Sequence, residues 1–396
     1  MIKRVDSIPQ KDCTACSVCL AVCPQNCIEM KADKEGFLYP FVDIHKCIEC
    51  EECYTNCPSV NFNKEALEPY KNEVYACQII DENIRRISSS GGAFSALSYP
   101  VLNLKGYVCG VSYTSDFKAV RHTIVNNEKE LDDLRRSKLL QSDKNDIFLS
   151  IEKLLKEGQR LLFSGTPCEV FALKSFLAKE YKYLYTCDLI CGCVASPKIY
   201  RKYLEHLENK YNSRIKSVNF KDKSKGWQER GIRIDFENGK SYVSDNANDP
   251  YMVSFHSRYG IRPSCFNCKF RGMDRLSDIT LGDFWGLKYY HKSLDDNQGT
   301  SYVMVNSQKG KDLLMETKRY MHIQKMDIDI TEYSNTYNLR VLNSPSPADE
   351  LNRSEFYNDL DVMEFDELFD KHLKSICLER KRKKEEYLRK LEAGIC

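Results

Sequence analysis

Eight cysteines near the start of the chain form two runs with the same spacing, C-x₂-C-x₂-C-x₃-C-P. The runs are Cys13, Cys16, Cys19, Cys23 and Pro24, then Cys47, Cys50, Cys53, Cys57 and Pro58. Three thiolates in a tight loop can hold three irons of one [4Fe–4S] cubane, while the fourth cysteine reaches a second cubane. The spacing therefore predicts two clusters with crossed ligands, one on Cys13, Cys16, Cys19 and Cys57 and the other on Cys47, Cys50, Cys53 and Cys23. Zinc sites use cysteines in pairs, which accounts for neither the third cysteine of each run nor the proline.

Length and composition indicate a globular protein whose cysteines serve metals. The 396 residues suffice for two or three domains, and the net charge of +2 gives no argument for a nucleic-acid or membrane-surface partner. No apolar stretch approaches the ~18 residues of a membrane span, and the first residues lack the apolar core of a signal peptide. Nineteen cysteines without such a peptide predict a reducing, cytoplasmic setting.

The pattern of elements predicts an α+β protein: an N-terminal ferredoxin-like two-cluster module, then a larger mixed α/β domain. We expect the module at 1–62, a polar linker at 63–74, the larger domain at 75–343 and a helical C-terminal tail at 344–396. Strands are expected at 28–30, 37–40, 41–43, 107–113, 119–125, 161–163, 183–185, 231–236, 242–243, 279–281 and 302–305. Helices are expected at 147–157 and 168–178, and Asn238-Gly239 predicts a hairpin turn. The charged end of the tail suits a solvated helix face or a partner-binding surface.

The segment 88–97, SSSGGAFSAL, predicts a helix with an open N-terminus. Hydroxyls and two glycines precede good helix formers, so backbone N–H groups could face a phosphate or pyrophosphate. A serine-rich N-cap without a ligand is the common alternative.

Six later cysteines form a further group of possible metal ligands. They are Cys168, Cys187, Cys191, Cys193, Cys265 and Cys268. The first opens a helix after a Gly-Thr-Pro turn, and the last two form a C-x₂-C pair. From spacing alone, zinc on Cys265 and Cys268 with two of the others stays possible beside a third iron–sulfur cluster.

Five ordered motifs carry a resemblance to a known family. They are SSSGGAFSAL (88–97), RRSKLLQSD (135–143), FSGTPCEVFALKSFL (163–177), CDLICGCVASP (187–197) and RPSCFNCKFRGMDRLSDITLGDFWG (262–286). Over about residues 1 to 370 the chain resembles the coenzyme F-420 hydrogenase/dehydrogenase beta-subunit family, preceded by a fused ferredoxin domain. The resemblance implies an FAD-binding α/β domain with a [4Fe–4S] cluster beside the flavin.

The resemblance also implies roles for residues of this chain. The FAD pyrophosphate would meet Ser89, Ser90, Gly91 and Gly92, in line with the open helix terminus. Lys138 and Gln141 would contact the flavin, where the Lys138 cation could stabilise negative charge on the reduced ring. The inner cluster would be held by Cys168, Cys191, Cys265 and Cys268. Seven thiols are then left over, and we expect structural roles for them: Cys27, Cys77, Cys109, Cys187, Cys193, Cys377 and Cys396.

One motif departs from the family. A histidine commonly follows the cysteine of the fourth motif, whereas this chain reads Cys191-Gly192-Cys193. The loop beside the flavin is therefore altered, and Cys193 could replace Cys191 as the ligand. Asp283 and Trp285 either line the cofactor pocket or serve as a strand-end carboxylate and core aromatic.

These features predict an oxidoreductase that couples two-electron flavin chemistry to one-electron transfer through [4Fe–4S] clusters. The alternative is an electron-transfer subunit without its own substrate that serves a partner enzyme, for example in polysaccharide synthesis or pyruvyl transfer. The expected partners are a redox protein and either a deazaflavin (coenzyme F-420) or another small molecule. An acidic patch, Glu49, Glu51 and Glu52, could steer a basic redox partner. A composition rich in Lys, Asn, Tyr and Ile is compatible with an anaerobe. The direction of electron flow is not predicted.

Overall fold

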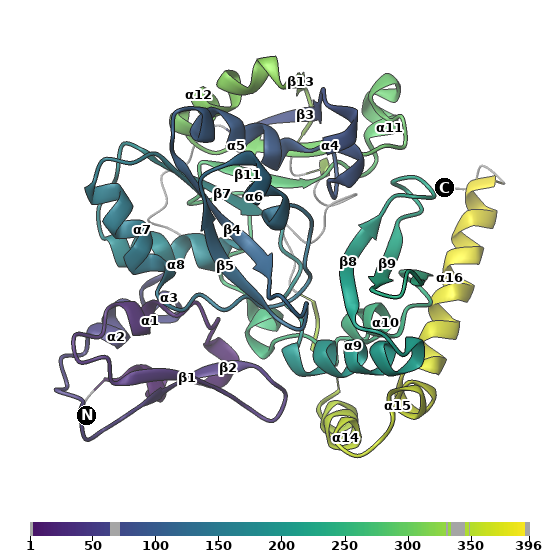
Figure 1. Ribbon diagram of the computed structural model, residues 1–396, viewed down its shortest axis with the longest axis horizontal. Coiled ribbons are helices and arrows are strands. Elements are labelled where there is room, and N and C mark those ends of the chain that lie inside the picture. Colours follow the sequence, from purple (N-terminus) through teal and green to yellow (C-terminus); the bar gives the residue numbers. More distant parts are fainter. Residues whose placement is uncertain (1–2, 64–71, 330–331, 334–344, 348, 393–396) are drawn as a thin grey trace.

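The computed structural model describes residues 3–63, 72–329, 332–333, 345–347 and 349–392, and the elements are labelled in Figure 1. An eight-stranded mixed sheet forms the centre of the molecule. In spatial order its strands are β13 (Met321–Met326), β3 (Glu73–Ile79), β12 (Ser301–Val305), β11 (Ile279–Asp283), β7 (Leu184–Leu189), β6 (Leu161–Gly165), β4 (Tyr107–Tyr113) and β5 (Val120–Val125). The four strands from β11 to β4 are parallel, and antiparallel pairs flank them on both sides.

Helices cover both faces of this sheet because its strands are apolar on both faces. One face packs against α5 (Ala93–Asn103), α6 (Glu128–Leu134) and α12 (Gln308–Glu316). The other face packs against α7 (Ile147–Lys156) and α8 (Pro167–Leu177). Successive residues of β6 alternate between the two cores, since Leu161 and Phe163 point to one and Leu162 to the other.

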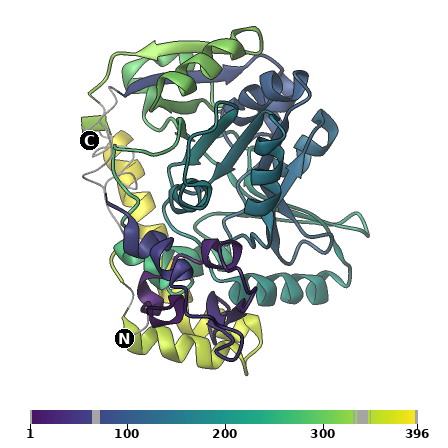
Figure 2. The ribbon, with the colours of Figure 1, turned by 90° about the vertical axis from the view of Figure 1, so that its left-hand side faces the viewer.

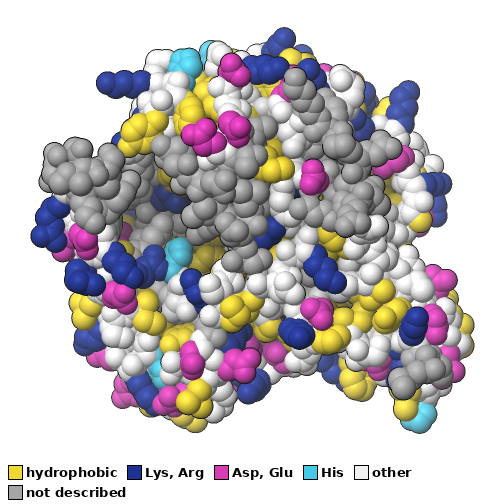
Figure 3. Space-filling model, turned by 180° about the vertical axis from the view of Figure 1, so that it is seen from behind, with side chains coloured by type: hydrophobic (Ala, Val, Ile, Leu, Met, Phe, Trp, Pro, Cys, Tyr) yellow, Lys and Arg dark blue, Asp and Glu magenta, His cyan; other side chains and the backbone are white. Residues whose placement is uncertain are grey.

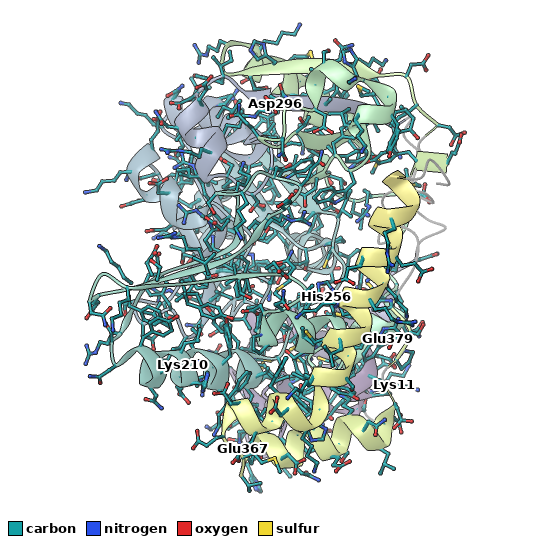
Figure 4. The ribbon with its side chains drawn as sticks, turned by 90° about the vertical axis from the view of Figure 1, so that its right-hand side faces the viewer. Lys11, Lys210, His256, Asp296, Glu367 and Glu379 are labelled. Carbon is teal, nitrogen blue, oxygen red and sulfur yellow. The ribbon has the colours of Figure 1, made fainter. Side chains whose placement is uncertain are left out.

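A second core forms around a small antiparallel sheet and the C-terminal helices. The sheet contains β8 (Ile215–Asp222), β9 (Gly231–Phe236) and β10 (Ser241–Asp245), and its helices are α9 (Pro197–Tyr211), α10 (Pro250–His256), α14 (Glu350–Leu360), α15 (Phe365–His372) and α16 (Lys374–Glu392). Phe356, Leu360 and Leu368 are buried in this core. Figure 4 shows α16, which carries Glu379, running along the outside of the molecule. The predicted C-terminal tail therefore contributes to the packing of the larger domain.

The N-terminal module lies beside α8 (Figure 1), and its purple ribbon is at the lower end of the molecule in Figure 2. It contains α1 (Val18–Ala21), β1 (Ile28–Ala32), β2 (Leu38–Val42), α2 (Glu52–Thr55) and α3 (Pro58–Asn61). Cys16 and Val18 are buried in the same core as α7 and α8, so the module packs directly against the larger domain. Contacts between Phe62, Phe171 and Phe270, with ring centroids 4.7–5.6 Å apart, add to this interface.

The predicted fold class is confirmed, since a ferredoxin-like region precedes a larger mixed α/β domain. The prediction of two strands at 37–40 and 41–43 is wrong, because one strand, β2, runs through Pro40. A two-stranded ribbon has free edges, so a proline without an N–H can remain within the strand. The domain boundaries stay predictions, and most of the linker expected at 63–74 lies outside the described residues, as does the boundary at 343/344.

The surface of the molecule carries charges of both signs. On the face shown in Figure 3, lysine and arginine side chains are interspersed with carboxylates. Within the described ranges, none of the helices combines the length and the apolar character that a membrane crossing needs.

Candidate functional site

The second cysteine run closes around a cavity near the surface of the N-terminal module. We call it the outer cavity, and Cys23, Cys27, Cys47, Cys50 and Cys53 are among its lining residues. It therefore brings together the four cysteines expected to hold one cluster, including Cys23 from the first run. Cys50 is exposed, which puts this site at the surface of the protein.

The remaining four cysteines of the runs, Cys13, Cys16, Cys19 and Cys57, form a second group that we call the Cys13 quartet. The pKa of the Cys16 thiol is raised to about 12, mainly by burial, with the nearby thiolates of Cys57 and Cys13 contributing. Burial also raises the pKa of Cys57, and Cys13 adds to the effect. Thiolates that repel one another in a buried site are stabilised when they coordinate a metal centre.

The two runs share one backbone geometry. Ala15 and Ser17 in the first run adopt left-handed φ angles of 50° and 65°, and Glu49 and Glu51 in the second adopt 58° and 59°. Left-handed residues between right-handed ones turn successive N–H groups into a concavity suited to anions, including iron–sulfur centres. The sequence duplication is therefore a duplication of the binding loop.

Five later cysteines line a second cavity, in the larger domain. We call it the inner cavity, and its cysteines are Cys168, Cys191, Cys193, Cys265 and Cys268. Cys168 lies in the first turn of α8 after β6, and Cys191 follows β7. Because β6 and β7 are parallel neighbours, their carboxyl ends deliver both cysteines to one edge of the sheet. The short helix Pro263–Asn267 supplies Cys265.

The thiols of the inner cavity influence one another. The pKa of Cys265 is raised to about 12, mainly by burial, with Cys193 and Cys268 contributing. Burial also raises the pKa of Cys191, with Cys265 and Cys268 as the next causes. Four or more converging thiolates fit a metal cluster, and the choice between Cys191 and Cys193 as ligand stays open.

The other cysteines divide into two kinds. Cys187 is fully buried in β7 and does not line the inner cavity, and Cys77 and Cys109 are also fully buried within strands. Cys27 is buried in the core of the module, as expected for a structural thiol, and it also lines the outer cavity with its Sγ 3.4 Å from that of Cys23. Cys396 lies outside the described residues.

Gln141 and Arg262 connect the inner cavity to the Cys13 quartet. Both line the inner cavity, as does Thr14. Gln141 donates from Nε2 to the carbonyl oxygen of Thr14 (3.0 Å), and Arg262 donates from Nε to the carbonyl oxygen of Cys13 (2.8 Å). The loop of the first run therefore forms part of the cavity wall. No pattern in the sequence indicated a role for Arg262.

The serine–glycine segment forms an open helix start at the same edge of the sheet. Gly92, the N-cap of α5, has φ 86° and no side chain to cap the helix, although the N–H of Ala93 donates to Oγ of Ser301 (3.4 Å). A Cβ at Gly91 would lie 2.3 Å from the carbonyl oxygen of Cys77, so only glycine fits there. Ser90 donates to the carbonyl oxygen of Thr300 (2.8 Å), which leaves its hydroxyl engaged with the protein. The uncapped N–H groups of α5 suit an anionic group.

Charged and aromatic side chains surround this helix start. Lys223 donates from Nζ to the carbonyl oxygen of Ser90 (3.0 Å), and burial lowers the pKa of Lys223 to about 8. Lys221 and Asp283 form an ion pair (2.6 Å). The ring of Trp285 stacks on that of Trp227 with centroids 4.4 Å apart. A place for Asp283 and Trp285 in the cofactor pocket stays a prediction, as does a role in packing.

The segment that contains Lys138 and Gln141 joins the two regions. The backbone N–H of Ser137 donates to Oγ of Ser89 (2.9 Å), and Gln141 lines the inner cavity. Lys138 is buried, and its Nζ donates to the carbonyl oxygens of Asp133 (3.0 Å) and Arg135 (2.5 Å) at the end of α6. Burial lowers the pKa of Lys138 to about 7. A flavin contact for Lys138 and Gln141 stays a prediction.

Two cysteine quartets on a ferredoxin-like fold define an iron–sulfur electron-transfer protein. Comparison with protein families gives the particular class: residues 12–61 match the 4Fe-4S dicluster domain, and residues 158–329 match the family described as the C terminus of the coenzyme F420 hydrogenase/dehydrogenase beta subunit. Over these residues the chain is similar to the F420 hydrogenase/dehydrogenase beta-subunit family, with a dicluster domain fused at its N-terminal side. The resemblance predicted from the motifs is confirmed.

Individual proteins show only a distant likeness to this chain. A chain of the F420-reducing [NiFe] hydrogenase complex from Methanosarcina barkeri, in a xenon-derivatised structure, is 14% identical, and the match covers 69% of this chain and 90% of that chain with a TM-score of 0.46. A likeness of that size is too low to indicate a shared activity. A comparison with curated protein sequences found no match.

Proposed function

We propose that the protein is an oxidoreductase that binds FAD and three [4Fe–4S] clusters and converts two-electron flavin chemistry into one-electron transfer. The uncapped start of α5 would hold the FAD pyrophosphate, with Gly91 and Gly92 allowing close approach and Lys223 holding the loop from behind. When bound, the flavin supplies the step between electron pairs and single electrons. The protein holds the pyrophosphate, orients the ring and excludes water.

The observation that carries the proposal is the continuity of the three sites. The segment around Ser137 and Gln141 runs from the serine–glycine loop to the inner cavity, and the Cys13 loop forms part of that cavity's wall. The inner cavity is thus adjacent both to the proposed flavin site and to the Cys13 quartet. This adjacency favours a [4Fe–4S] cluster over zinc in the inner cavity, because zinc cannot carry electrons.

The outer cavity is the end of this path that a protein partner could reach. Cys50 and the apolar side chain of Ile48 line this cavity and are exposed. We propose a redox protein as the partner at this surface. Whether the flavin also reacts with a small substrate, such as a deazaflavin, separates an enzyme from an electron-transfer subunit.

Anaerobic purification followed by iron, sulfide, zinc and flavin analysis tests the proposal. We expect about twelve irons and about one FAD for each chain, since each cubane holds four irons. About eight irons with bound zinc, or the absence of flavin, would contradict it. A screen of reduced deazaflavin, NADH and reduced ferredoxin as electron donors then distinguishes the two forms of the function.

A further inference from the structure

Arg262 lies at the junction between the N-terminal module and the larger domain, with its side chain fully buried (0% exposed). Its three side-chain nitrogens each donate a hydrogen bond to a neutral oxygen. Nε donates to the carbonyl of Cys13 (2.8 Å), Nη1 to Oε1 of Gln141 (2.8 Å) and Nη2 to the carbonyl of Leu38 (2.9 Å). The guanidinium also lies 4.4 Å from the ring centroid of Tyr39.

These partners leave the positive charge of Arg262 uncompensated. Among the side chains that the structure describes, no carboxylate forms an ion pair with it, although a buried charge without an opposite charge is costly. Arg262 has only a small lowering effect on the pKa of the Asp33 carboxyl. Burial has the largest effect and raises that pKa. Arg275, which lines the same cavity, differs in having Asp188 as its partner (3.4 Å).

Two groups of cysteine thiolates beside Arg262 could supply the missing negative charge. Arg262 lines the inner cavity, where its charge opposes the rise that burial causes in the pKa of Cys265. It also binds the peptide of Cys13, a member of the Cys13 quartet. Four thiolates outweigh the charge of a cubane core, so a cluster at either place is anionic and becomes more so on reduction.

We infer that Arg262 is a positioning residue that acts as the shared counter-charge of the inner cluster and the Cys13 cluster and raises the reduction potentials of both. A buried cation beside a cluster stabilises its reduced form, because it offsets the negative charge that reduction adds. Arg262 does not line the outer cavity, so we expect the potential of a cluster there to be insensitive to its charge. The inference rests on the proposed function, because it requires a cluster in the inner cavity.

The test is a redox titration followed by electron paramagnetic resonance on the anaerobically purified full chain and two variants. In Arg262→Gln we expect the midpoint potentials of the inner and Cys13 clusters to fall by at least about 59 mV. For one electron this corresponds to a ~tenfold change in the equilibrium constant of reduction. The potential of the outer cluster should not change. Arg262→Lys keeps the charge, so its shift should be smaller.

Lys198→Gln is the matched control, since Lys198 is a cation that also holds the module by donating to the carbonyl of Lys34 (2.8 Å) but does not line the inner cavity. It should leave every potential unchanged.

Wild-type protein with only about eight irons contradicts the proposed function, whereas about twelve irons with unchanged potentials in Arg262→Gln overturns the inference. Equal shifts in the Lys and Gln variants also overturn it. If Arg262→Gln loses iron but Arg262→Lys retains it, the result supports a counter-charge role for Arg262. Loss of iron from both variants contradicts that role.

Discussion

At the scale of single residues, the thiols divide by what they face. Cys265 points into the inner cavity with other thiols, while Cys187, which is closer to Cys191 in sequence, is enclosed by apolar strands. The sequence placed both in the same group of late cysteines. Only the direction of each side chain separates a ligand candidate from a packing residue.

Replacing Cys265 with Ser tests that division. We expect a loss of about four irons and of one cluster signal in electron paramagnetic resonance, because serine is a poor ligand for a cubane. Cys187→Ser, the matched control, should retain all the iron. Loss of zinc in place of iron from Cys265→Ser would show that the inner cavity is a zinc site.

Lys138 provides a prediction of pH dependence. Its pKa is lowered from 10.5 to about 7 by burial, so between these values the unfolded chain binds a proton that the folded protein does not. Stability should therefore rise with pH across this window, by at most about 1.4 kcal/mol per pH unit. Urea unfolding from pH 7 to pH 10 should give a free-energy difference between wild type and Lys138→Met that grows with pH. Lys129→Met, at an exposed position of α6, should give a constant difference, and a constant difference for Lys138→Met would contradict the prediction.

At the scale of elements, the start of α5 depends on close packing against the sheet. Gly91 accepts a hydrogen bond from the N–H of Ile79 (2.8 Å) and donates to Oγ of Ser301 (3.0 Å), so the loop is attached to β3 and β12. Position 91 requires glycine because the backbone of the loop lies so close to that of β3 that a Cβ has no room.

The substitution Gly91→Ala should therefore displace the loop. A Cβ 2.3 Å from the carbonyl of Cys77 forces movement, and we expect a loss of about 1–3 kcal/mol in the free energy of unfolding together with a lower flavin content. Gly110→Ala is the matched control, because its Cβ would meet Leu134 at an ordinary 3.4 Å. Similar flavin content in the wild type and Gly91→Ala would argue against FAD at this helix start.

At the scale of the whole molecule, a C-terminal helix contacts the N-terminal module. Arg353, on α14, donates from Nε to Oε1 of Glu35 (2.9 Å) in the turn between β1 and β2, and also to the carbonyl of Arg258 (3.0 Å). The C-terminal helices therefore help to hold the N-terminal module against the larger domain.

Breaking this contact should weaken the whole assembly. Arg353→Ala leaves Glu35 without its partner in a buried position, which we expect to cost about 3–5 kcal/mol in the free energy of unfolding. The double variant Arg353→Met, Glu35→Gln removes both charges and should lose much less. Equal losses in the single and double variants would show that the charge pair is not the cause.

The sequence by itself determined the local features. The spacing of each cysteine run, the turn at Asn238-Gly239 and the apolar strands such as 107–113 depend on neighbours within a few residues, and periodicity records such neighbours. The tertiary structure decided what those features face. Arg262 and Cys13 are 249 positions apart, and no local pattern relates them, yet chain packing places the guanidinium of one against the carbonyl of the other. Cys27 and Gln141 acquire their places in the same way, because a cavity is formed by segments that only the folded chain brings together.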